Sequence, residues 1–550
     1  MKKILTLCCI LLLGASIWAQ ENASSTDITC PKMESGAQCQ LMTEISALHQ
    51  ELSQLRNDVL TLRQDMLTLM SNQEESEFLA KLSNAISTLD GLLWGWPLII
   101  LLGAAHLWMT LRLKFIQRYI PLGIKLSVAK DDSGTGEISQ FGALAIALAA
   151  TIGTGNIIGV ATAIVKGGPG AVLWCWIFGV LGIATKYAES LISVKFRIHD
   201  TDGKTHGGAM YAIERGMNCK SLAIMFAAFT IIASFGIGNM TQSNAIAENM
   251  IKTLNVAPES IAAWKGYIGL AEAALIAAVV MGGLKAVSRL CEALVPFMAA
   301  FYVIGCIIVL CICNDFVWSA IKLICTEAFS MRAVTGGALG TVMMIALRYG
   351  VARGLFSNES GLGSAPIVAA NAKTKNAVRQ ALISSTGTFW DTVIICAMTG
   401  ICVISAVLKS TNGVVPNWGT FNAPELTSEA FANIPVVGKY ILMIALIIFA
   451  YTTILGWFCY GSEACHYLGG KWGMPIFRVL FVICIFLGAV CELDMVWNIS
   501  DLGNGLMAIP NIIAIFALSK VIISESQKYL WSGNINAIDP DCAKIDCEAN

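Results

Sequence analysis

The chain has 550 residues, of which 56% are hydrophobic and 13% are charged, and its formal net charge is −1. Soluble domains carry about 25% charged residues, so this composition predicts a polytopic membrane protein with little soluble mass and argues against a nucleic-acid partner. The 19 cysteines lie mostly within apolar stretches, and together with the five histidines they show no metal-site spacing. Because no nucleophile–base arrangement is evident either, we do not expect an enzyme.

Residues 1–20 have the pattern of a secretory signal peptide. Lys2 and Lys3 precede an apolar run, Ile4–Leu13, and the sequence Ser16-Ile-Trp-Ala19 follows before Gln20. We expect cleavage near Ala19, and the alternative is an uncleaved signal anchor. In either case residues 21–90 are exported, which predicts a bacterial inner-membrane protein with a periplasmic N-terminal segment.

A seven-residue repeat of apolar side chains follows at 41–69. Its members are spaced alternately by four and three residues, and they are Leu41, Ile45, Leu48, Leu52, Leu55, Val59, Leu62, Met66 and Leu69. This spacing predicts a coiled-coil helix. The seam requires a partner, which is a second copy of the chain, another protein or a helix at 82–89 that folds back; we favour self-association. Cys30 and Cys39 either form a disulfide in this oxidising compartment or remain two free thiols.

The chain from 91 to 523 predicts eleven transmembrane helices. The first, at 93–113, leads into a strongly basic loop that ends near Lys130, and the positive-inside rule places this loop in the cytoplasm. The other ten are expected at 141–165, 171–194, 222–246, 266–283, 290–313, 334–351, 381–407, 437–466, 475–493 and 496–523. Alternation then places the tail at 524–550 in the cytoplasm, where Cys542 and Cys547 should be reduced.

The second of these spans contains a glycine-rich stretch, Thr151–Val160. Its three glycines, Gly153, Gly155 and Gly159, are interspersed with Thr151, Thr154 and Asn156. Glycine lowers the cost of leaving helical geometry, and the threonine and asparagine side chains can satisfy freed backbone groups. We expect the helix to break near the bilayer midplane, which exposes a half-helix N-terminus to an anion and unwound carbonyls to a cation. The alternative is a continuous helix packed through its small residues.

Two further spans offer groups for a binding site. In the fourth, Asn239 and Gln242 are one turn apart on one face, where they either line the site or bond neighbouring helices. The seventh opens with Thr335–Gly340, in which the adjacent Gly336 and Gly337 predict a second broken helix, as an inverted repeat requires.

Hydroxyl, aromatic and acidic groups occur in the ninth and eighth spans. Thr452 and Thr453 either complete a cation site or bond carbonyls of their own helix. Trp457, about one turn on, either walls the substrate pocket or fills the core. Asp391 keeps proton coupling as an alternative, although we favour a paired structural carboxylate.

Three connections carry patterns of their own. The amphipathic stretch 316–329 is expected to lie along the outer membrane surface, and the loop 409–435 forms either an external lid or a plain connection. After the seventh span, the segment 353–366 is expected to be a cytoplasmic gate, in which glycines bend the loop and Glu359 pairs with Arg353.

The stretch at 151–160 and the sequence Gly354-Leu-Phe-Ser-Asn-Glu-Ser-Gly-Leu-Gly-Ser-Ala-Pro366 together resemble the alanine/glycine:cation symporter family, the sodium:alanine symporters, over about 93–523. The resemblance implies an all-α polytopic fold similar to that of the leucine transporter (LeuT). In that fold ten core helices form two inverted five-helix repeats (5+5), here preceded by one extra helix. The signal peptide and the periplasmic coiled-coil helix depart from the family's pattern, so oligomeric state and regulation stay open.

The resemblance also implies a secondary active transporter that takes up small neutral amino acids, alanine or glycine, by alternating access, with sodium as the coupling ion and no other cofactor. The local pattern and the resemblance together assign Gly153, Thr154, Gly155, Asn156, Gln242, Gly336, Gly337 and Trp457 to the substrate and Thr151, Thr452 and Thr453 to the cation. The expected partners are the amino acid, sodium and membrane lipid. The alternatives are proton-coupled symport and an amino-acid sensor that signals through its coiled coil.

Overall fold

A computed structural model describes residues 83–129, 134–200, 203–330, 342–491 and 494–540, with two isolated positions at 54 and 81. The chain divides into two units after Lys81, and everything below concerns the second. Several expectations lie outside the described residues: the signal peptide, the coiled coil at 41–69, the thiols of Cys30, Cys39, Cys542 and Cys547, and the break at Gly336 and Gly337.

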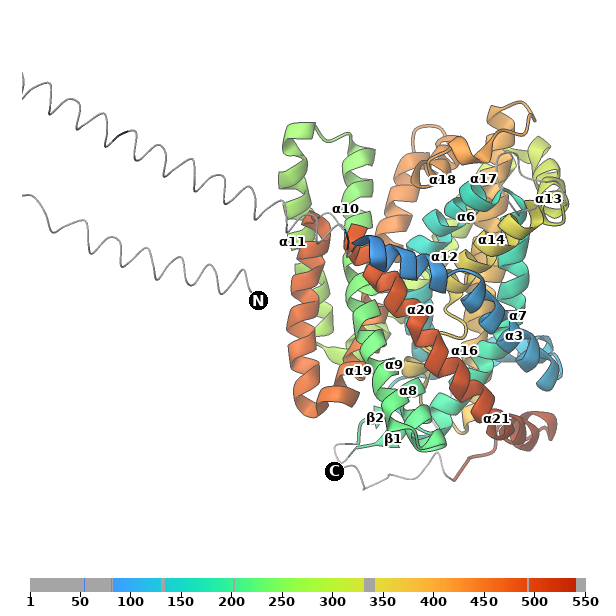
Figure 1. Ribbon diagram of the computed structural model, residues 1–550, viewed down its shortest axis with the longest axis vertical. Coiled ribbons are helices and arrows are strands. Elements are labelled where there is room, and N and C mark those ends of the chain that lie inside the picture. The colour runs from blue at the N-terminus through green and yellow to red at the C-terminus, as the bar shows by residue number, and fades with distance from the viewer. Residues whose placement is uncertain are drawn as a thin grey trace, which may run out of the picture. The chain divides into compact units, whose positions relative to one another are not determined.

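The described part of the chain is almost entirely helical (Figure 1). Its first part contains α3 (Trp96–Arg112), η1 (Ile116–Tyr119), α4 (Ile120–Val128), α5 (Gln140–Thr151), η2 (Gly155–Gly159), α6 (Val160–Gly167), α7 (Gly170–Lys195), β1 (Ile198–His199), β2 (Thr205–His206), α8 (Ala209–Tyr211) and η3 (Ala212–Gly216). Next come α9 (Lys220–Phe235), η4 (Gly236–Met240), α10 (Thr241–Leu254), η5 (Pro258–Ser260), α11 (Ile261–Val280), α12 (Gly283–Ile312) and α13 (Asn314–Ala328). The last part contains α14 (Val342–Asn358), α15 (Pro366–Ala369), α16 (Ala377–Thr388), η6 (Phe389–Cys396), α17 (Ala397–Ser410), η7 (Trp418–Thr420), α18 (Ala423–Ala432), α19 (Gly438–Val490), α20 (Asp494–Ala517), α21 (Ser519–Ser526) and η8 (Gln527–Trp531).

Many of these elements are long enough to cross a membrane. Within the described ranges nine helices meet the requirements of length and apolar composition, and a bent pair, Gln140–Thr151 with Gly155–Gly167, makes a tenth span if it is counted as one. A helix needs about 20 apolar residues to cross the hydrocarbon core of a bilayer, and its internal hydrogen bonds satisfy the backbone groups where water is absent. The chain is therefore a multi-pass membrane protein. The expected seventh span is described only from α14 onward.

Two boundaries differ from the sequence-based expectation. The eleventh span was expected to end at 523, but α20 ends at Ala517, and Leu518 leaves helical geometry (φ −92°, ψ 11°) before α21 begins. Serine and lysine follow at 519 and 520, so the apolar run is interrupted there. The helix α19 covers the ninth expected span and the tenth as far as Val490, and it is divided at Gly470, whose φ of 57° suits glycine.

The expected surface segments are also helical. The amphipathic stretch near 316–329 forms α13, which packs on α7 and α17. The loop 409–435 is not a plain connection, because it contains α18, which packs on α6, α17 and α19. Together with the turn between α10 and α11, these elements form one end of the helical body, and the hairpin β1–β2 and α21 lie at the opposite end (Figure 1).

The hairpin was not expected from the sequence. Its strands are antiparallel and only two residues long, with Ile198 opposite His206. Such short strands have no alternating pattern that could be recognised in a sequence. Arg197, just before β1, fixes the hairpin in place, because its Nη1 donates to the carbonyls of Ala370 (3.0 Å) and Ala372 (2.8 Å).

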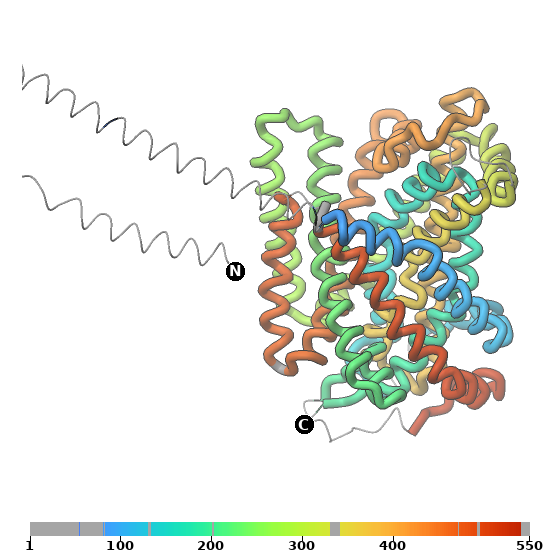
Figure 2. The backbone as a smooth tube through the Cα atoms, viewed as in Figure 1, coloured from blue at the N-terminus to red at the C-terminus, as the bar shows by residue number. Residues whose placement is uncertain are grey.

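Small residues let the helices pack closely around the bent span. A Cβ added at Gly350 on α14 would lie 2.2 Å from the carbonyl oxygen of Ala171 on α7, and one at Gly456 on α19 would lie 2.7 Å from Ala150 on α5. In membranes, such contacts replace the hydrophobic driving force that soluble proteins use. The tube in Figure 2 shows how α3 (blue) and α20 (red) cross one side of this bundle.

Candidate functional site

The predicted break in the second span is present. The helix α5 ends at Thr151, Ile152 is extended (φ −78°, ψ 91°), and η2 and α6 continue at an angle of 51° to α5. The second half begins as a π-helix from Gly155 to Gly159, a geometry that is frequent at functional sites. The backbone N–H of Gly153 donates to Asn156 Oδ1 (2.9 Å), so the asparagine supplies the acceptor that a continuous helix would have provided.

Asn156 also joins the break to a buried acidic group on η6. Its Nδ2 donates to Asp391 Oδ1 at 2.7 Å. The same carboxylate accepts from Ser357 Oγ at the end of α14 (3.1 Å) and from Thr392 Oγ1 (2.6 Å). All four side chains are buried. Every hydrogen bond that the structure gives to this carboxylate comes from a neutral donor. Its negative charge is therefore not paired by these donors, and the carboxylate can take up a proton or bind a hard cation.

The three threonines assigned to the cation have different partners in the structure. Thr453 Oγ1 donates to the carbonyl of Ala149 on α5 (3.0 Å), and a Cβ added at Gly153 would lie 2.5 Å from that hydroxyl. Thr452 instead contacts the carbonyl of Phe449 in its own helix (3.0 Å) and the sulfur of Met298 on α12 (3.2 Å), neither of which belongs to α5. Thr151 likewise donates to Ala147 in α5 (3.0 Å). Of these three, Thr453 is therefore the one that bonds from α19 to α5 at the break.

The polar pair of the fourth span is also divided. Gln242 Oε1 accepts from Thr154 Oγ1 (3.2 Å), which ties α10 to the break. Asn239 was expected on the same face, but its Nδ2 donates to the carbonyl of Phe481 on α19 (2.7 Å). The π-helix η4 lies between α9 and α10, and each i→i+5 turn shifts the register of the side chains that follow. Spacing alone could not reveal this shift.

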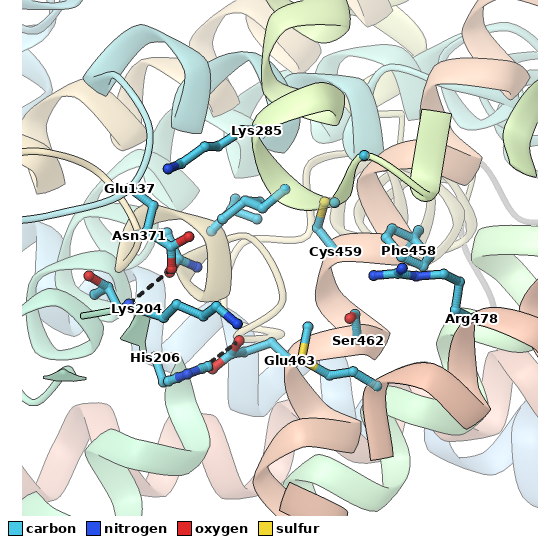
Figure 3. A pocket seen from close by; sticks show the side chains of 16 residues that line it. Glu137, Lys204, His206, Lys285, Asn371, Phe458, Cys459, Ser462, Glu463 and Arg478 are labelled. Atoms are coloured by element: carbon cyan, nitrogen blue, oxygen red, sulfur yellow. Dashed lines mark hydrogen bonds and ion pairs between the residues drawn. The ribbon is translucent and has the colours of Figure 1, made fainter. Parts of the chain in front are cut away.

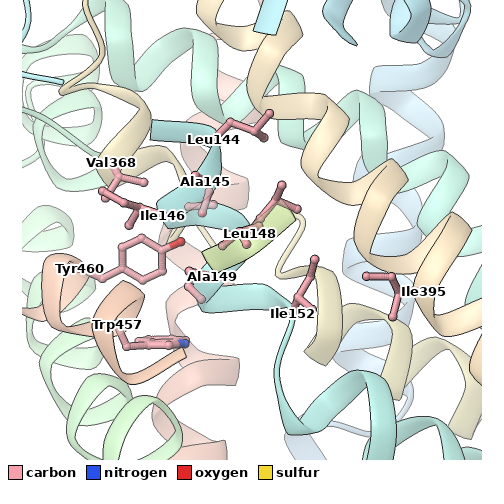
Figure 4. Close-up of a cluster of buried hydrophobic side chains, with 14 of the residues drawn as sticks. Leu144, Ala145, Ile146, Leu148, Ala149, Ile152, Val368, Ile395, Trp457 and Tyr460 are labelled. Carbon is pink, nitrogen blue, oxygen red and sulfur yellow. The ribbon is translucent and has the colours of Figure 1, made fainter. Parts of the chain in front are cut away.

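Trp457 lies in the packed core. It is 1% exposed, and a Cβ added at Gly238 on η4 would lie 2.3 Å from its Cβ and Cγ. Figure 4 shows Trp457 and Tyr460 extending from α19 beside Ala149 and its neighbours on α5. The ring therefore supports the wall formed by α19 next to the break, and its expected contact with a substrate stays a prediction.

A cavity of about 660 Å³ reaches the break from the end of the molecule that carries α18. Its inner part is formed by Thr154, Gly155, Ile158 and Phe356, and its outer part by residues of α10, α18, the start of α19 and α20, including Asn244, Glu248, Lys252, Ser428, Lys439, Trp497 and Asp501. Phe356 lies directly against the break, since a Cβ added at Gly155 would be 3.6 Å from its ring. Thr154 and Gly155 are thus the predicted site residues that face this cavity.

The loop that follows α14 closes the route beyond the break. Glu359 and Arg353 were expected to pair, and this is wrong: the Glu359 carboxylate accepts from Ser364 Oγ (2.5 Å), whereas Arg353 lies over the Phe356 ring (5.6 Å) and lines the cavity. The helix α14 ends at Asn358, and Glu359, the next residue, has a positive φ of 54°. The backbone therefore turns away from the helix there, and the Glu359 carboxylate points in a different direction from Arg353.

A buried carboxylate on α7 holds this loop in its bent form. Glu189 Oε2 accepts from the backbone N–H groups of Gly361 (3.1 Å) and Gly363 (3.2 Å) and from Asn511 Nδ2 on α20 (2.8 Å). Both glycines have positive φ, 89° and 83°, a conformation in which a side chain is strained. Lys186 forms an ion pair with Glu189 (3.4 Å). The loop is therefore fastened to α7 and α20 beneath the break.

Several residues of this region were not recognised in the sequence. Phe356 and Ser357 lie within the motif that carried the family resemblance, and this was a usable signal. Arg353 and Asp501 line the same cavity from α14 and α20, but they are far apart in the chain and no pattern connects them. Thr392 was likewise missed, because its role depends on the carboxylate of Asp391 beside it.

Comparison with known proteins adds independent evidence. The model of the sodium:alanine symporter family matches residues 79–540. The chain is 42% identical over 451 residues to the sodium/alanine symporter AgcS of Methanococcus maripaludis, covering 81% of this chain and 96% of AgcS. It is 44% identical over 469 residues to an uncharacterized transporter of Haemophilus influenzae, covering 84% of this chain and 99% of that protein.

A solved structure supports the fold. The crystal structure of MhsT in complex with L-phenylalanine aligns with a TM-score of 0.51 at 14% identity, covering 73% of this chain and 95% of MhsT. At this identity the likeness concerns the fold alone. MhsT has the LeuT fold, so the described helices share that architecture.

Proposed function

Because the chain belongs to the sodium:alanine symporter family, we propose that it is a secondary active transporter that couples the uptake of alanine or glycine to sodium. Membership supports amino-acid and cation symport in general. The finer assignments, namely the substrate, sodium itself and inward direction in a bacterial inner membrane, are proposals. We also propose that the end with α18 faces the periplasm, as the basic residues of the opposite loops predict.

The observation that carries the proposal is the broken span at the inner end of a cavity. The half-helix that begins at Gly155 presents its N-terminus there, and the first amides of a helix have no partner within it. A carboxylate is stabilised at such an N-terminus. The substrate carboxylate would therefore bind near Thr154 and Gly155. The amide of Gly153 is already used by Asn156 and does not belong to this set.

Space at the break favours a small substrate. Phe356 and Ser357 lie 3.6–3.7 Å from the position of a Cβ at Gly155, so the room beside the freed amides is limited by an aromatic ring. A methyl group or a hydrogen fits next to such a wall more easily than a long side chain. This supports alanine or glycine over larger neutral amino acids.

Two arrangements of oxygen ligands could hold the coupling ion. One is the carbonyl of Ala149 with the hydroxyl of Thr453, and Thr151 and Thr452 would join it by turning from the carbonyls that they now contact. The other is the carboxylate of Asp391 with Ser357 and Thr392. Hard cations are held by oxygen ligands of these kinds. The second arrangement also keeps proton coupling as the alternative function, because a buried carboxylate can carry a proton.

The difference between the two ends of the molecule supports alternating access. The cavity opens toward α18, while the loop at 359–365 is fastened beneath the break by Glu189 and Asn511. Transport would require the first route to close and these contacts to separate. The protein would then exchange between a state open at the α18 end and a state open at the opposite end. Bound substrate and ion would shift the balance between these states by the difference in their binding free energy for the two.

Purified protein in liposomes tests the proposal. Uptake of radiolabelled alanine should rise when an inward sodium gradient is imposed and fall when potassium replaces sodium outside, whereas a proton gradient alone should have no effect. Uptake driven by protons without sodium would instead establish the alternative. Absence of uptake with alanine, glycine and serine under either gradient would contradict the proposed substrates.

A further inference from the structure

A second cavity, of about 310 Å³, lies at the end of the molecule that carries the hairpin β1–β2 (Figure 3). His206 of β2 and Glu463 of α19 are among its lining residues. His466 follows Glu463 by three residues, so both project from one face of α19. The candidate ligand atoms of His206, Glu463 and His466 all lie within 4.8 Å of one another. We infer that these three side chains form a binding site for a divalent transition-metal ion such as Zn²⁺.

The three groups are already close to one another without an ion. His206 Nδ1 lies 3.0 Å and 3.2 Å from the two carboxylate oxygens of Glu463. The rings of His206 and His466 stack at 3.8 Å between centroids with 6° between their planes. His206 and Glu463 are buried and His466 is half-buried. The three side chains are thus held by their surroundings before any ion arrives.

Two details distinguish this cluster from an ordinary salt bridge. The Nδ1 of His466 is buried and has no hydrogen-bond partner among the described residues. Nε2 of His206 lies 3.4 Å from Asp200 Oδ2. A carboxylate on the outer nitrogen of a ligand histidine is the usual arrangement at metal sites, where it fixes the tautomer and the ring orientation. Asp200 would therefore be a positioning residue for His206.

The donor set indicates which ions would bind. Two imidazoles and one carboxylate, with a water molecule as the fourth ligand, are a common set for Zn²⁺ at about 2.0–2.2 Å. Ligand atoms of a tetrahedral zinc site lie about 3.3 Å apart at such bond lengths, so the side chains must draw together slightly. The two rings must also turn out of their stack, because a metal lies in the plane of each imidazole that binds it.

The charges around the cavity favour nitrogen-bound metals over hard cations. Three positively charged side chains, Lys204, Lys285 and Arg478, line the same cavity. The carboxylate of Glu137, which also lines the cavity, accepts from the backbone N–H of Thr205. The three positive charges oppose ions held mainly by charge, such as Mg²⁺ or Ca²⁺. Transition metals gain directed bonds to imidazole, which suits Zn²⁺, Ni²⁺ and Cu²⁺. The cavity itself provides a route by which the ion can enter.

A bound ion would link the hairpin β1–β2 to α19, two elements that lie far apart in the chain. The hairpin follows α7, whereas α19 carries Thr453 beside the break. A bound ion would hold the hairpin to α19 and so stabilise the closed form of this end. If the protein is a transporter, as proposed above, the ion would slow transport by opposing the opening of this end. This last step rests on the proposed function, whereas ion binding does not.

Binding is measured on the purified full-length protein after treatment with a chelator. Calorimetric titration with Zn²⁺ should show one site per chain in the wild type, and this site should be lost in His466→Ala. Co²⁺ should give the visible absorption of a tetrahedral site in the wild type alone. Asp200→Asn should weaken binding by about 10–100-fold while keeping the stoichiometry, since outer ligand partners have effects of this size.

Neighbouring thiols provide the control. Cys465 precedes His466 in the chain and Cys459 lines the cavity, and both are free thiols. Cys465→Ser and Cys459→Ser should leave Zn²⁺ binding unchanged. Retained binding in His466→Ala, or loss in either cysteine variant, would overturn the proposal, as would the absence of a saturable site in the wild type. Zn²⁺ should also raise the melting temperature of the wild type but not of His466→Ala, and this comparison shows that both chains are folded.

The effect on transport is a separate measurement. In liposomes, Zn²⁺ on the side of the hairpin should reduce the uptake of alanine by the wild type and leave His466→Ala unaffected. If Zn²⁺ binds but uptake is unchanged, the regulatory consequence is wrong and the site stands. If no variant transports an amino acid, the proposed function fails while the calorimetric result still decides the metal site.

Discussion

At the scale of single residues, the site depends on polar side chains that replace the hydrogen bonds of a broken helix. Asn156 accepts from Gly153 with its oxygen and donates to Asp391 with its nitrogen, so both ends of one amide are used. Unsatisfied polar groups are costly in a membrane interior, and this makes the arrangement rigid. The Thr154 hydroxyl likewise donates to Gln242 Oε1, which links the break to the neighbouring helix α10.

Replacement of Asp391 by asparagine tests the cation arrangement. Asp391→Asn should raise the sodium concentration for half-maximal uptake by about 10–100-fold, because contacts to a charged group contribute ~1.5–3 kcal/mol and each 1.4 kcal/mol is a factor of ten. Uptake by proteoliposomes at varied sodium concentration gives this value. Asp315→Asn, at the exposed start of α13, is the matched control. Unchanged sodium dependence in Asp391→Asn would leave the Ala149–Thr453 arrangement as the cation site.

Gln242 should be required for uptake because it holds Thr154 at the end of the cavity. Gln242→Ala removes the acceptor of the Thr154 hydroxyl and should abolish alanine uptake while the protein still purifies as a monodisperse species. Asn156→Ala should have the same result. Thr241→Val is the control, since among the described residues the Thr241 hydroxyl donates to the carbonyl of Ile237 in its own span. Wild-type uptake in Gln242→Ala would remove this residue from the site.

At the scale of elements, the glycines of the second span have different roles that the structure separates. Gly153 provides space for the Thr453 hydroxyl on α19, whereas a Cβ at Gly159 would meet nothing within 4 Å. Gly155 leaves room for the ring of Phe356 on α14. The break is therefore a point where α5, α14 and α19 approach the same short piece of backbone.

This difference gives a matched pair of substitutions. Gly153→Ala should destabilise the protein, by about 1–3 kcal/mol if the site behaves like an overpacked core, and should impair sodium-dependent uptake because Thr453 must move away from α5. Gly159→Ala should leave both properties close to wild type. Thermal unfolding in detergent and uptake in liposomes provide the measurements. Equal effects of the two substitutions would mean that helix propensity, rather than the contact with Thr453, governs this segment.

At the scale of the whole molecule, one end is open to a cavity and the other end is closed. The end with α18 is open to a cavity of about 660 Å³, and the end with the hairpin is closed by buried contacts of Arg197, Glu189 and the loop at 359–365. A carrier that alternates between two such states exposes its site to one side at a time. The structure corresponds to the state that we propose is open to the periplasm.

The segment before the helical body should be an appendage to transport. Deletion of residues 21–75 should leave alanine uptake in liposomes unchanged, because the cavity, the break and the loop beneath it all lie after residue 83. The shortened chain keeps the signal peptide, and its amount in the membrane is matched to the full chain before rates are compared. Loss of uptake would show that the coiled coil expected at 41–69 is required for the transport cycle, and lost signalling with normal uptake would indicate a sensor.

The sequence by itself determined the features that depend on local patterns. Long apolar runs predicted eleven spans, and ten of these correspond to the nine helices and the bent pair found among the described residues. The cluster Thr151–Val160 predicted the break, because glycine content and backbone satisfaction are properties of a short stretch. Only the tertiary structure decided which side chains meet. Asn156 and Asp391 are separated by 235 residues, and His206 and Glu463 by 257. Contacts over such separations depend on how helices pack and on register shifts at π-helices, and neither is visible in a local pattern.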